Sequence, residues 1–276
     1  MIELLETIED IARTAGQRIL DVRARGLTSR TKSDGSPVTE ADTYAEELIL
    51  AELQRIDPTT TIVAEELNDA AGTSADVGKR FYLVDPLDGT KEFLKGNDDF
   101  TVNIALIRNG IPVLGVVCAP ARNETFSGFV GGGARCTWLD AAGVVQPRDL
   151  RVRPASKALD AVVSVSHMTP ATQKLLGALE IRDKVSVGSS LKFCLVAAAE
   201  ADIYPRLGPT MQWDTAAGDA VLRSAGGTTI DREGLPLGYG PRTGDGHPFL
   251  NPEFIALGGE VQGLMPGLVA GGWHRS

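Results

Sequence analysis

The residues of this chain best suited to chemistry gather in one short segment, residues 85–90 (DPLDGT). An apolar stretch runs directly into Asp85, and a second acid, Asp88, follows three residues later, just before Gly89. Pro86 has no N–H to donate to a strand ladder, and glycine tolerates a left-handed backbone, so a tight turn is expected here. Two carboxylates on one loop suit a hard cation such as Mg²⁺, which prefers oxygen ligands. An ordinary turn rich in Asp and Gly remains the alternative.

Two further acidic positions follow a similar pattern. Glu65 comes directly after the short apolar stretch 61–64, and Asp214 stands between Trp213 and a segment of small residues. An Asp at the start of a helix is ordinarily a capping residue, so Asp214 taken alone has a purely structural interpretation. The small residues that follow it nevertheless allow that helix to pack very close to its neighbours.

A convergence of these acids would have an electrostatic consequence. Two like charges 4 Å apart repel by about 4 kcal/mol at an effective dielectric constant near 20, so four such acids require bound cations. Convergence therefore implies two or more metal ions, an arrangement that serves in-line displacement at phosphorus. The acids concerned are Glu65, Asp85, Asp88 and Asp214.

Two more residues fit the same chemistry. Thr90 lies two positions after Asp88 and is placed to touch an attacking water. Asp42 is placed to hold the Thr90 hydroxyl so that its lone pair faces that water. The alternative for Asp42 is a capping box with Thr39, because the two have the spacing of an N-cap and an N3 acid.

Helices and strands alternate along both halves of the chain, which favours a layered α/β sandwich over a bundle or an all-β fold. Apolar periodicity predicts two long N-terminal helices, and residues 67–79 read as a surface loop. A polar, Pro- and Arg-rich stretch near 140–157 suggests a domain boundary, giving residues 1–150 and 151–276. The first domain would carry most of the acids, and the second would carry Asp214. The predicted helices are residues 2–25, 39–57, 190–199 and 214–225, with a further helix that starts at residues 169–170. The predicted strands are residues 61–64, 80–84, 101–107, 111–117, 124–130, 161–165, 185–187, 203–204, 228–230 and 254–257.

Composition excludes several classes of protein. With 27 Lys and Arg against 36 Asp and Glu, the formal net charge is −9, so a binder of nucleic-acid polymers is not expected. No apolar run is long enough to span a bilayer. Cys118, Cys136 and Cys194 are too far apart for a zinc site and read as core residues. We expect a cytoplasmic protein, free or peripheral on the cytoplasmic face of the inner membrane, and a monomer or homodimer.

Three segments, residues 65–66, 85–90 and 213–218, resemble the metal-site motifs of the inositol monophosphatase superfamily and occur in the same order. Further stretches are similar to its 3′(2′),5′-bisphosphate nucleotidase branch, and the resemblance covers about residues 1–257. It implies the two-domain αβαβα sandwich shared with fructose-1,6-bisphosphatase, two or three Mg²⁺ ions, a role in sulfur assimilation and sensitivity to Li⁺. The stretches similar to the nucleotidase branch are residues 32–42, 88–93, 188–194 and 204–206.

The resemblance also implies roles for individual residues. The Leu87 carbonyl would join the four acids as a metal ligand, and Asp42, Glu65 and Thr90 would activate the water. Gly89 and Thr90 would contact the scissile phosphate at a helix N-terminus. The nucleotide would be bound by residues that match the branch's Ser-x-x-Lys pair, downstream Arg and substrate-side His. The implied substrate contacts are Glu65, Leu87, Asp88, Gly89, Thr90, His167, Ser189, Lys192, Arg206 and Asp214.

Within this resemblance the substrate we favour is 3′-phosphoadenosine 5′-phosphate or its sulfated form. An inositol monophosphatase or a sugar-bisphosphate phosphatase would share the same metal ligands and stays the alternative. A non-catalytic nucleotide or metal sensor is a more distant one, since Asp42, Glu65 and Thr90 are all retained. A haloacid-dehalogenase-type phosphatase spaces its acids by two, whereas Asp85 and Asp88 are three apart.

The segment 85–90 generates the first prediction. Asp88→Asn keeps the shape of the side chain but removes its charge, so we expect kcat to fall by several orders of magnitude with the fold intact. Steady-state phosphate release and circular dichroism measure the two properties. Turnover at the wild-type rate in this variant would remove Asp88 from the metal site.

Overall fold

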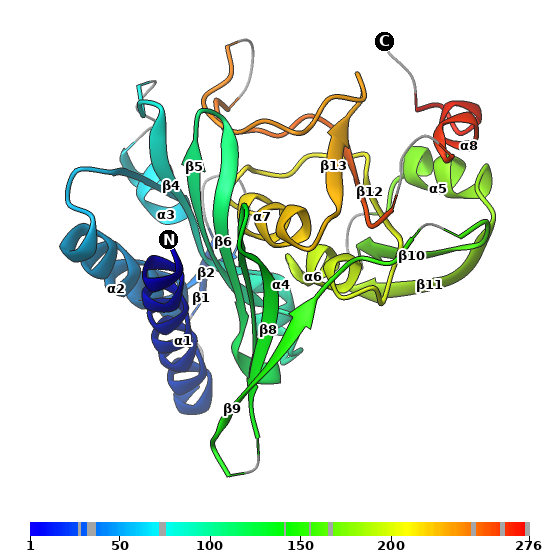
Figure 1. Cartoon of the computed structure of the whole chain (residues 1–276). Helices are drawn as coiled ribbons and strands as arrows, with labels where there is room; N and C mark the ends of the chain where they lie inside the picture. The colour runs from blue at the N-terminus through cyan, green and yellow to red at the C-terminus, as the bar shows by residue number, and fades with distance from the viewer. Residues whose placement is uncertain are drawn as a thin grey trace.

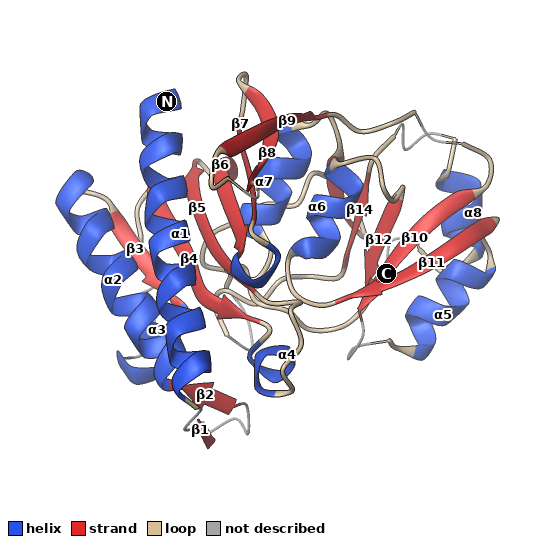
Figure 2. Ribbon diagram, turned by 90° about the horizontal axis from the view of Figure 1, so that it is seen from below, coloured by secondary structure: helices blue, strands red, loops and turns tan. Residues whose placement is uncertain are grey.

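The computed structural model describes residues 1–26, 29–31, 37–71, 76–140, 142–154, 156–164, 168–243, 247–259 and 263–273. Within these residues the chain forms five alternating layers of helices and sheets (Figures 1 and 2). The layered α/β fold class predicted from the sequence is therefore confirmed.

A pair of helices forms the first layer. α1 (Ile2–Arg25) and α2 (Glu40–Ile56) pack against each other and against one face of the large sheet (Figure 1). α1 ends at Gly26 as predicted, where a φ of 93° favours glycine. α2 begins with the predicted capping box between Thr39 and Asp42, which satisfies backbone N–H groups at the helix start.

The second layer is a seven-stranded sheet with the order β3-β4-β5-β6-β7-β8-β9. The pair β3–β4 is parallel, and every other neighbouring pair is antiparallel. The carboxyl ends of β3 and β4 therefore meet at the same edge of the sheet. The strands are β3 (Thr61–Ala64), β4 (Arg80–Asp88), β5 (Thr101–Arg108), β6 (Ile111–Ala119), β7 (Glu124–Phe129), β8 (Gly133–Leu139) and β9 (Val145–Leu150).

The remaining three layers lie on the other face of this sheet. Helices α6 (Leu191–Ala197) and α7 (Ala216–Ser224) fill the space between the two sheets (Figure 1). Helices α5 (Pro170–Gly177) and α8 (Met265–Ala270) cover the far side of the second sheet. That sheet has the order β11-β10-β12-β14-β13 and is made of β10 (Leu159–Ser164), β11 (Ile181–Val187), β12 (Ile203–Arg206), β13 (Thr228–Asp231) and β14 (Phe254–Leu257).

Several expectations about local structure are wrong. The predicted loop from residue 67 begins as α3 (Glu65–Ala71), where the acids of the first turn complement the helix dipole. β9, which the sequence did not predict, lies within the polar stretch 140–157 and completes a hairpin with β8, and the domain boundary placed there stays a prediction. The remaining elements of the described chain are short: β1 (Ser29–Thr31), β2 (Pro37–Thr39), α4 (Thr90–Leu94) and the 3₁₀-helix η1 (Pro120–Arg122).

Each sheet belongs to one half of the chain, since the larger uses residues 61–150 and the smaller residues 159–257. We keep the division into 1–150 and 151–276 as a proposal, because α7 of the second half packs on β6 of the first. The three cysteines are buried and unpaired, as expected of core residues. Among the described residues, no helix combines the length and apolar character needed to cross a bilayer.

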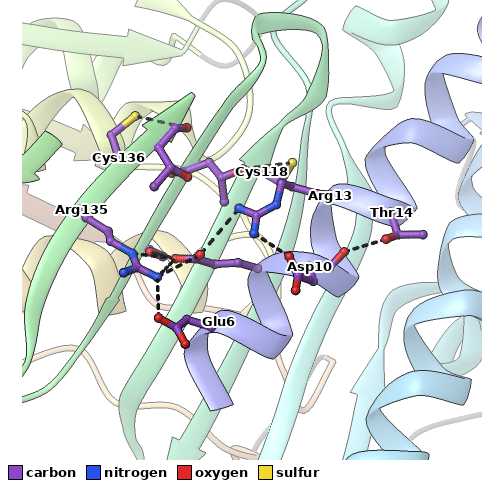
Figure 3. Close-up of polar contacts among 11 residues, drawn as sticks. Glu6, Asp10, Arg13, Thr14, Cys118, Arg135 and Cys136 are labelled. Atoms are coloured by element: carbon purple, nitrogen blue, oxygen red, sulfur yellow. Dashed lines mark hydrogen bonds and ion pairs between the residues drawn. The ribbon is translucent and has the colours of Figure 1, made fainter. Parts of the chain in front are cut away.

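Buried charges attach α1 to the large sheet. Glu9, only 3% exposed, accepts a hydrogen bond from the Ser127 hydroxyl and two from the Arg135 guanidinium, both at 3.0 Å. Figure 3 shows Arg135 also facing Glu6, while Arg13 faces Asp10 on the helix itself. Pairing and hydrogen bonding are what make such a buried carboxylate tolerable.

The contact between β6 and α7 generates the second prediction. A Cβ on Gly115 of β6 would lie 2.3 Å from the Ala217 carbonyl oxygen of α7, so the helix would have to move. We expect Gly115→Ala to lower the free energy of unfolding by about 1–3 kcal/mol, as overpacking typically does. Urea denaturation measures this change.

Gly177→Ala is the matched control. Nothing lies within 4 Å of a Cβ at this position, and its φ is outside the left-handed region, so stability should stay the same or rise slightly. Equal stability of the two variants would show that α7 does not need the close approach at Gly115.

Candidate functional site

Strand β4 carries two acids to the edge of the large sheet. Asp85, 1% exposed, pairs with Asn103 of β5, and the next pair is Asp88 with Thr101. One extra residue of β4 is therefore accommodated in a bulge. Such bulges redirect side chains at the ends of strands.

Backbone hydrogen bonds fix the shape of this loop. The Leu87 N–H donates to Asp85 Oδ1 at 3.0 Å, so Asp85 does make the turn contact that the alternative interpretation expected. Gly89 has a φ of 94°, and a Cβ there would lie 3.0 Å from the Asp99 carbonyl oxygen. Asp85 keeps its second carboxylate oxygen for another partner, so a turn and a ligand site are compatible in this loop.

The other two acids reach the same place from different elements. Glu65 directly follows β3, and the parallel pairing of β3 with β4 brings it to the edge where β4 ends. Asp214 precedes α7, and its Oδ2 accepts a hydrogen bond from the Met211 N–H at 2.9 Å. Thr215 is the N-cap residue of α7, so the interpretation of Asp214 as the cap of this helix is wrong.

The four acids line one cavity of about 250 Å³. Burial raises the pKa of Asp85 well above its usual range, and the charges of Glu65, Asp88 and Asp214 add to this effect. Burial likewise raises the pKa of Asp214, with Asp88 and Glu65 adding to it. The carboxylates therefore interact strongly although they come from three separate parts of the fold: β4, the start of α3 and the segment before α7.

The donor set of this cavity fits a hard divalent cation. It consists of carboxylate oxygens and backbone carbonyls, with no Cys or His among the residues described as lining the cavity. Such a set suits Mg²⁺ and not zinc, which favours nitrogen and sulfur. As the side chains stand, no three His, Cys, Asp or Glu of the described chain form a ready-made metal cluster. The structure thus brings the acids into one cavity without closing a ligand shell.

Thr90 and Asp42 meet beside the acid loop. Thr90 Oγ1 lies 3.2 Å from Asp42 Oδ1 and 3.2 Å from the Leu87 carbonyl oxygen. The other oxygen of Asp42 accepts the N–H and the hydroxyl of Thr39, both at 2.7 Å. Asp42 therefore caps α2 with one oxygen and holds Thr90 with the other, so the two interpretations of this residue are compatible.

The opposite wall of the cavity carries positive charge. Lys192, 5% exposed, donates hydrogen bonds to the Ser189 and Val187 carbonyls, and its Nζ lies 5.4 Å from the centre of the Tyr204 ring. Burial lowers the pKa of Lys192 to about 8, and the charge of Asp88 opposes this shift. These contacts hold the Lys192 amino group close to the acids, and the charge of Asp88 favours its protonated form.

Two buried polar atoms on this wall have no hydrogen-bond partner among the residues that the structure describes. They are the Ser189 hydroxyl and Nε of Arg206, which also donates through another nitrogen to the Pro209 carbonyl. Buried polar groups are ordinarily satisfied, so unpaired ones beside a cavity indicate a ligand that completes them. Both residues line the cavity, together with Gly89 and Leu87. His167 lies outside the described residues.

Asn103 and Ser190 are not among the site residues predicted from the sequence. Asn103 is fully buried behind the acid loop, and Ser190 lies on the cavity wall. One signal was available, because Thr101 and Asn103 are polar residues at alternate positions of an otherwise apolar strand, and therefore face the same side.

The fold and the cavity together define a class: a five-layer α/β sandwich with clustered acids on one wall of a cavity and Lys192 and Arg206 on the other. The chain belongs to the inositol monophosphatase family, whose model matches residues 1–256. It is 43% identical over 254 residues to the 3′(2′),5′-bisphosphate nucleotidase CysQ of Escherichia coli K12, covering 91% of this chain and 98% of that enzyme.

Solved structures agree with this assignment. CysQ from Bacteroides thetaiotaomicron, a bacterial member of the inositol monophosphatase family, is 35% identical with a TM-score of 0.76, covering 94% of this chain and 98% of that one. The Thermotoga maritima inositol monophosphatase TM1415 shares the fold, with 24% identity, a TM-score of 0.75 and coverage of 98% and 97%.

The crowding of the acids generates the third prediction. Asp85→Asn keeps the Leu87 hydrogen bond but removes one of four interacting charges. In EDTA the variant should therefore melt higher than wild type, by about 2–4 °C for each kcal/mol of repulsion relieved. Added Mg²⁺ should raise the melting temperature of wild type more than that of the variant. Differential scanning calorimetry in both conditions makes the comparison, and a variant that melts lower in EDTA would contradict it.

Proposed function

We propose that this chain is a Mg²⁺-dependent phosphatase that removes the 3′-phosphate of 3′-phosphoadenosine 5′-phosphate to give AMP. The 5′-phosphosulfate form would give adenylyl sulfate. The observation that carries the proposal is one cavity with clustered acids on one wall and Lys192, Arg206 and Ser189 on the other. The 43% identity to a bisphosphate nucleotidase over nearly its whole length supports this choice of substrate.

Members of this family generally depend on Mg²⁺. We assign two or three ions to the acidic wall, where they would supply positive charge against the phosphate oxygens and lower the pKa of a water. The residues proposed to hold them are Glu65, Asp85, Asp88, Asp214 and, through its carbonyl, Leu87.

The chain's own residues orient the attacking water. The Thr90 hydroxyl donates a hydrogen bond to Asp42, which leaves its lone pair to accept a hydrogen bond from the water. Glu65, half-buried on the cavity wall, is assigned to hold the water from the other side. The water oxygen bonds to phosphorus while one of its protons passes to the Glu65 carboxylate. The bond from phosphorus to O3′ breaks, and O3′ takes up a proton from solvent. Fixing the water in line contributes through orientation alone.

Backbone and basic groups bind the nucleotide. The N–H groups of Gly89 and Thr90 are assigned to the scissile phosphate. Lys192 and Arg206 are assigned to the phosphate that remains, and the unpaired Ser189 hydroxyl to a further polar contact, with His167 as an additional substrate contact. A protein of net charge −9 needs such local cations to bind a substrate with two phosphates.

Inositol monophosphatase or sugar-bisphosphate phosphatase activity is the second candidate, because it would use the same acids. The Thermotoga maritima inositol monophosphatase has the same fold, so this activity stays the alternative. A non-catalytic sensor is opposed by the contact between Thr90 and Asp42, which a mere binding protein has no need to keep. We further propose that the enzyme acts in the cytoplasm, free or peripherally at the inner membrane, as a monomer or homodimer.

The fourth prediction compares substrates. Wild type with Mg²⁺ should show a much higher kcat/KM for 3′-phosphoadenosine 5′-phosphate than for inositol 1-phosphate, measured by phosphate release. Arg206→Gln should narrow this ratio, since the lost cation faces only the second phosphate. An equal or reversed preference in wild type would refute the nucleotidase assignment and leave the inositol phosphatase one.

A further inference from the structure

Asn103 connects Asp88 of the first half of the chain to Asp214 of the second half through hydrogen bonds. Its side chain is fully buried in β5, directly behind the loop that carries Asp85 and Asp88. Its amide makes three hydrogen bonds. Nδ2 donates two of them, and Oδ1 accepts the third, which fixes the orientation of the amide.

Two of these contacts lie within the first half. Nδ2 of Asn103 donates to Asp88 Oδ2 at 3.3 Å. Oδ1 accepts the Thr101 hydroxyl at 2.9 Å, so the amide is held with its N–H groups toward the cavity. Since Thr101 is also fully buried, water does not compete for this contact.

The third contact crosses to the second half. Nδ2 also donates to the Ser190 hydroxyl oxygen at 3.0 Å, between residues 87 positions apart. The Ser190 hydroxyl in turn donates to the backbone carbonyl of Asp214. Ser190 is 2% exposed and immediately precedes α6. A continuous chain of hydrogen bonds thus links the Asp88 carboxylate to the backbone of Asp214.

We propose that Asn103 and Ser190 are a positioning pair that sets the separation of Asp88 and Asp214 and thereby the affinity of the cavity for Mg²⁺. This inference rests on the proposed function and assigns a role to two residues that act by holding Asp88 and Asp214 in place. Groups behind metal ligands commonly have this effect, because they fix the orientation of the ligands.

The chemistry of the two side chains suits the task. An amide supplies donors without charge, whereas a carboxylate at position 103 would add a fifth negative group to the cavity and an apolar residue would leave Ser190 and Asp88 short of a donor. A serine hydroxyl accepts from Asn103 and donates to Asp214 at once. Removing either partner leaves a buried polar group unsatisfied.

The fifth prediction tests this pair on the full-length chain. We would titrate wild type, Asn103→Ala, Ser190→Ala and the double variant with Mg²⁺ alone, by isothermal titration calorimetry without substrate. Each single variant should raise the Kd for Mg²⁺ about 10–100-fold. The double variant should be little weaker than either single one, because the two residues act through one chain of contacts.

Ser127→Ala is the matched control. It also removes a fully buried hydroxyl bonded to a carboxylate, Glu9, but on the α1 side of the large sheet. It should lower the melting temperature without changing the Kd for Mg²⁺. A rise in Kd of the same size in this control would show that general loosening of the fold explains the effect, and would overturn the inference.

Two other outcomes also overturn it. One is a Mg²⁺ Kd in both single variants equal to that of wild type, and the other is a double variant whose effect is the product of the single ones. Ser190→Ala decides the matter alone if Asn103→Ala does not fold. If wild type binds no Mg²⁺, the proposed metal site is overturned as well. If wild type binds Mg²⁺ and the variants have the same Kd, only this inference is overturned.

Discussion

The repulsion among four carboxylates in one cavity is the constraint on which the rest of this structure depends. Burial and mutual charge together raise the pKa of Asp85 and Asp214, so the acids oppose their own convergence at neutral pH. Folding must therefore hold them together by other contacts. The acids lie on β4, at the start of α3 and just before α7, and the packing of those elements provides the free energy that offsets the repulsion.

The two sheets and the helices between them supply that packing. Parallel pairing of β3 with β4 sets Glu65 beside the acid loop, and the antiparallel partner β5 places Asn103 behind it. On the other side, α7 approaches β6 closely because Gly115 has no side chain, and this brings Asp214 to the same cavity. A site assembled from four elements in this way is sensitive to small shifts of any one of them.

The charge of the cavity is balanced locally, whatever the net charge of the chain. Lys192 of α6 is buried near Asp88, and Nε of Arg206, on β12, has no hydrogen-bond partner in the described part of the chain. The acidic wall needs bound cations, and the basic wall needs a bound anion. A phosphate ester bound through metal ions satisfies both walls at once. That complementarity distinguishes this cavity from a simple cation site.

Local patterns in the sequence were sufficient to predict much of this protein. Periodicity located α1, α2 and the central hairpin, and residues 85–90 identified the acid loop, because turns, caps and amphipathic faces depend on neighbours only a few residues away. They did not predict β9 or α8, which are held by tertiary contacts. Nor did they predict the link from Asn103 to Ser190 and on to Asp214, or that Asp214 bonds to Met211 and does not cap α7. Those contacts depend on how the second half packs on the first, and only the tertiary structure decides which residues so distant in sequence become neighbours.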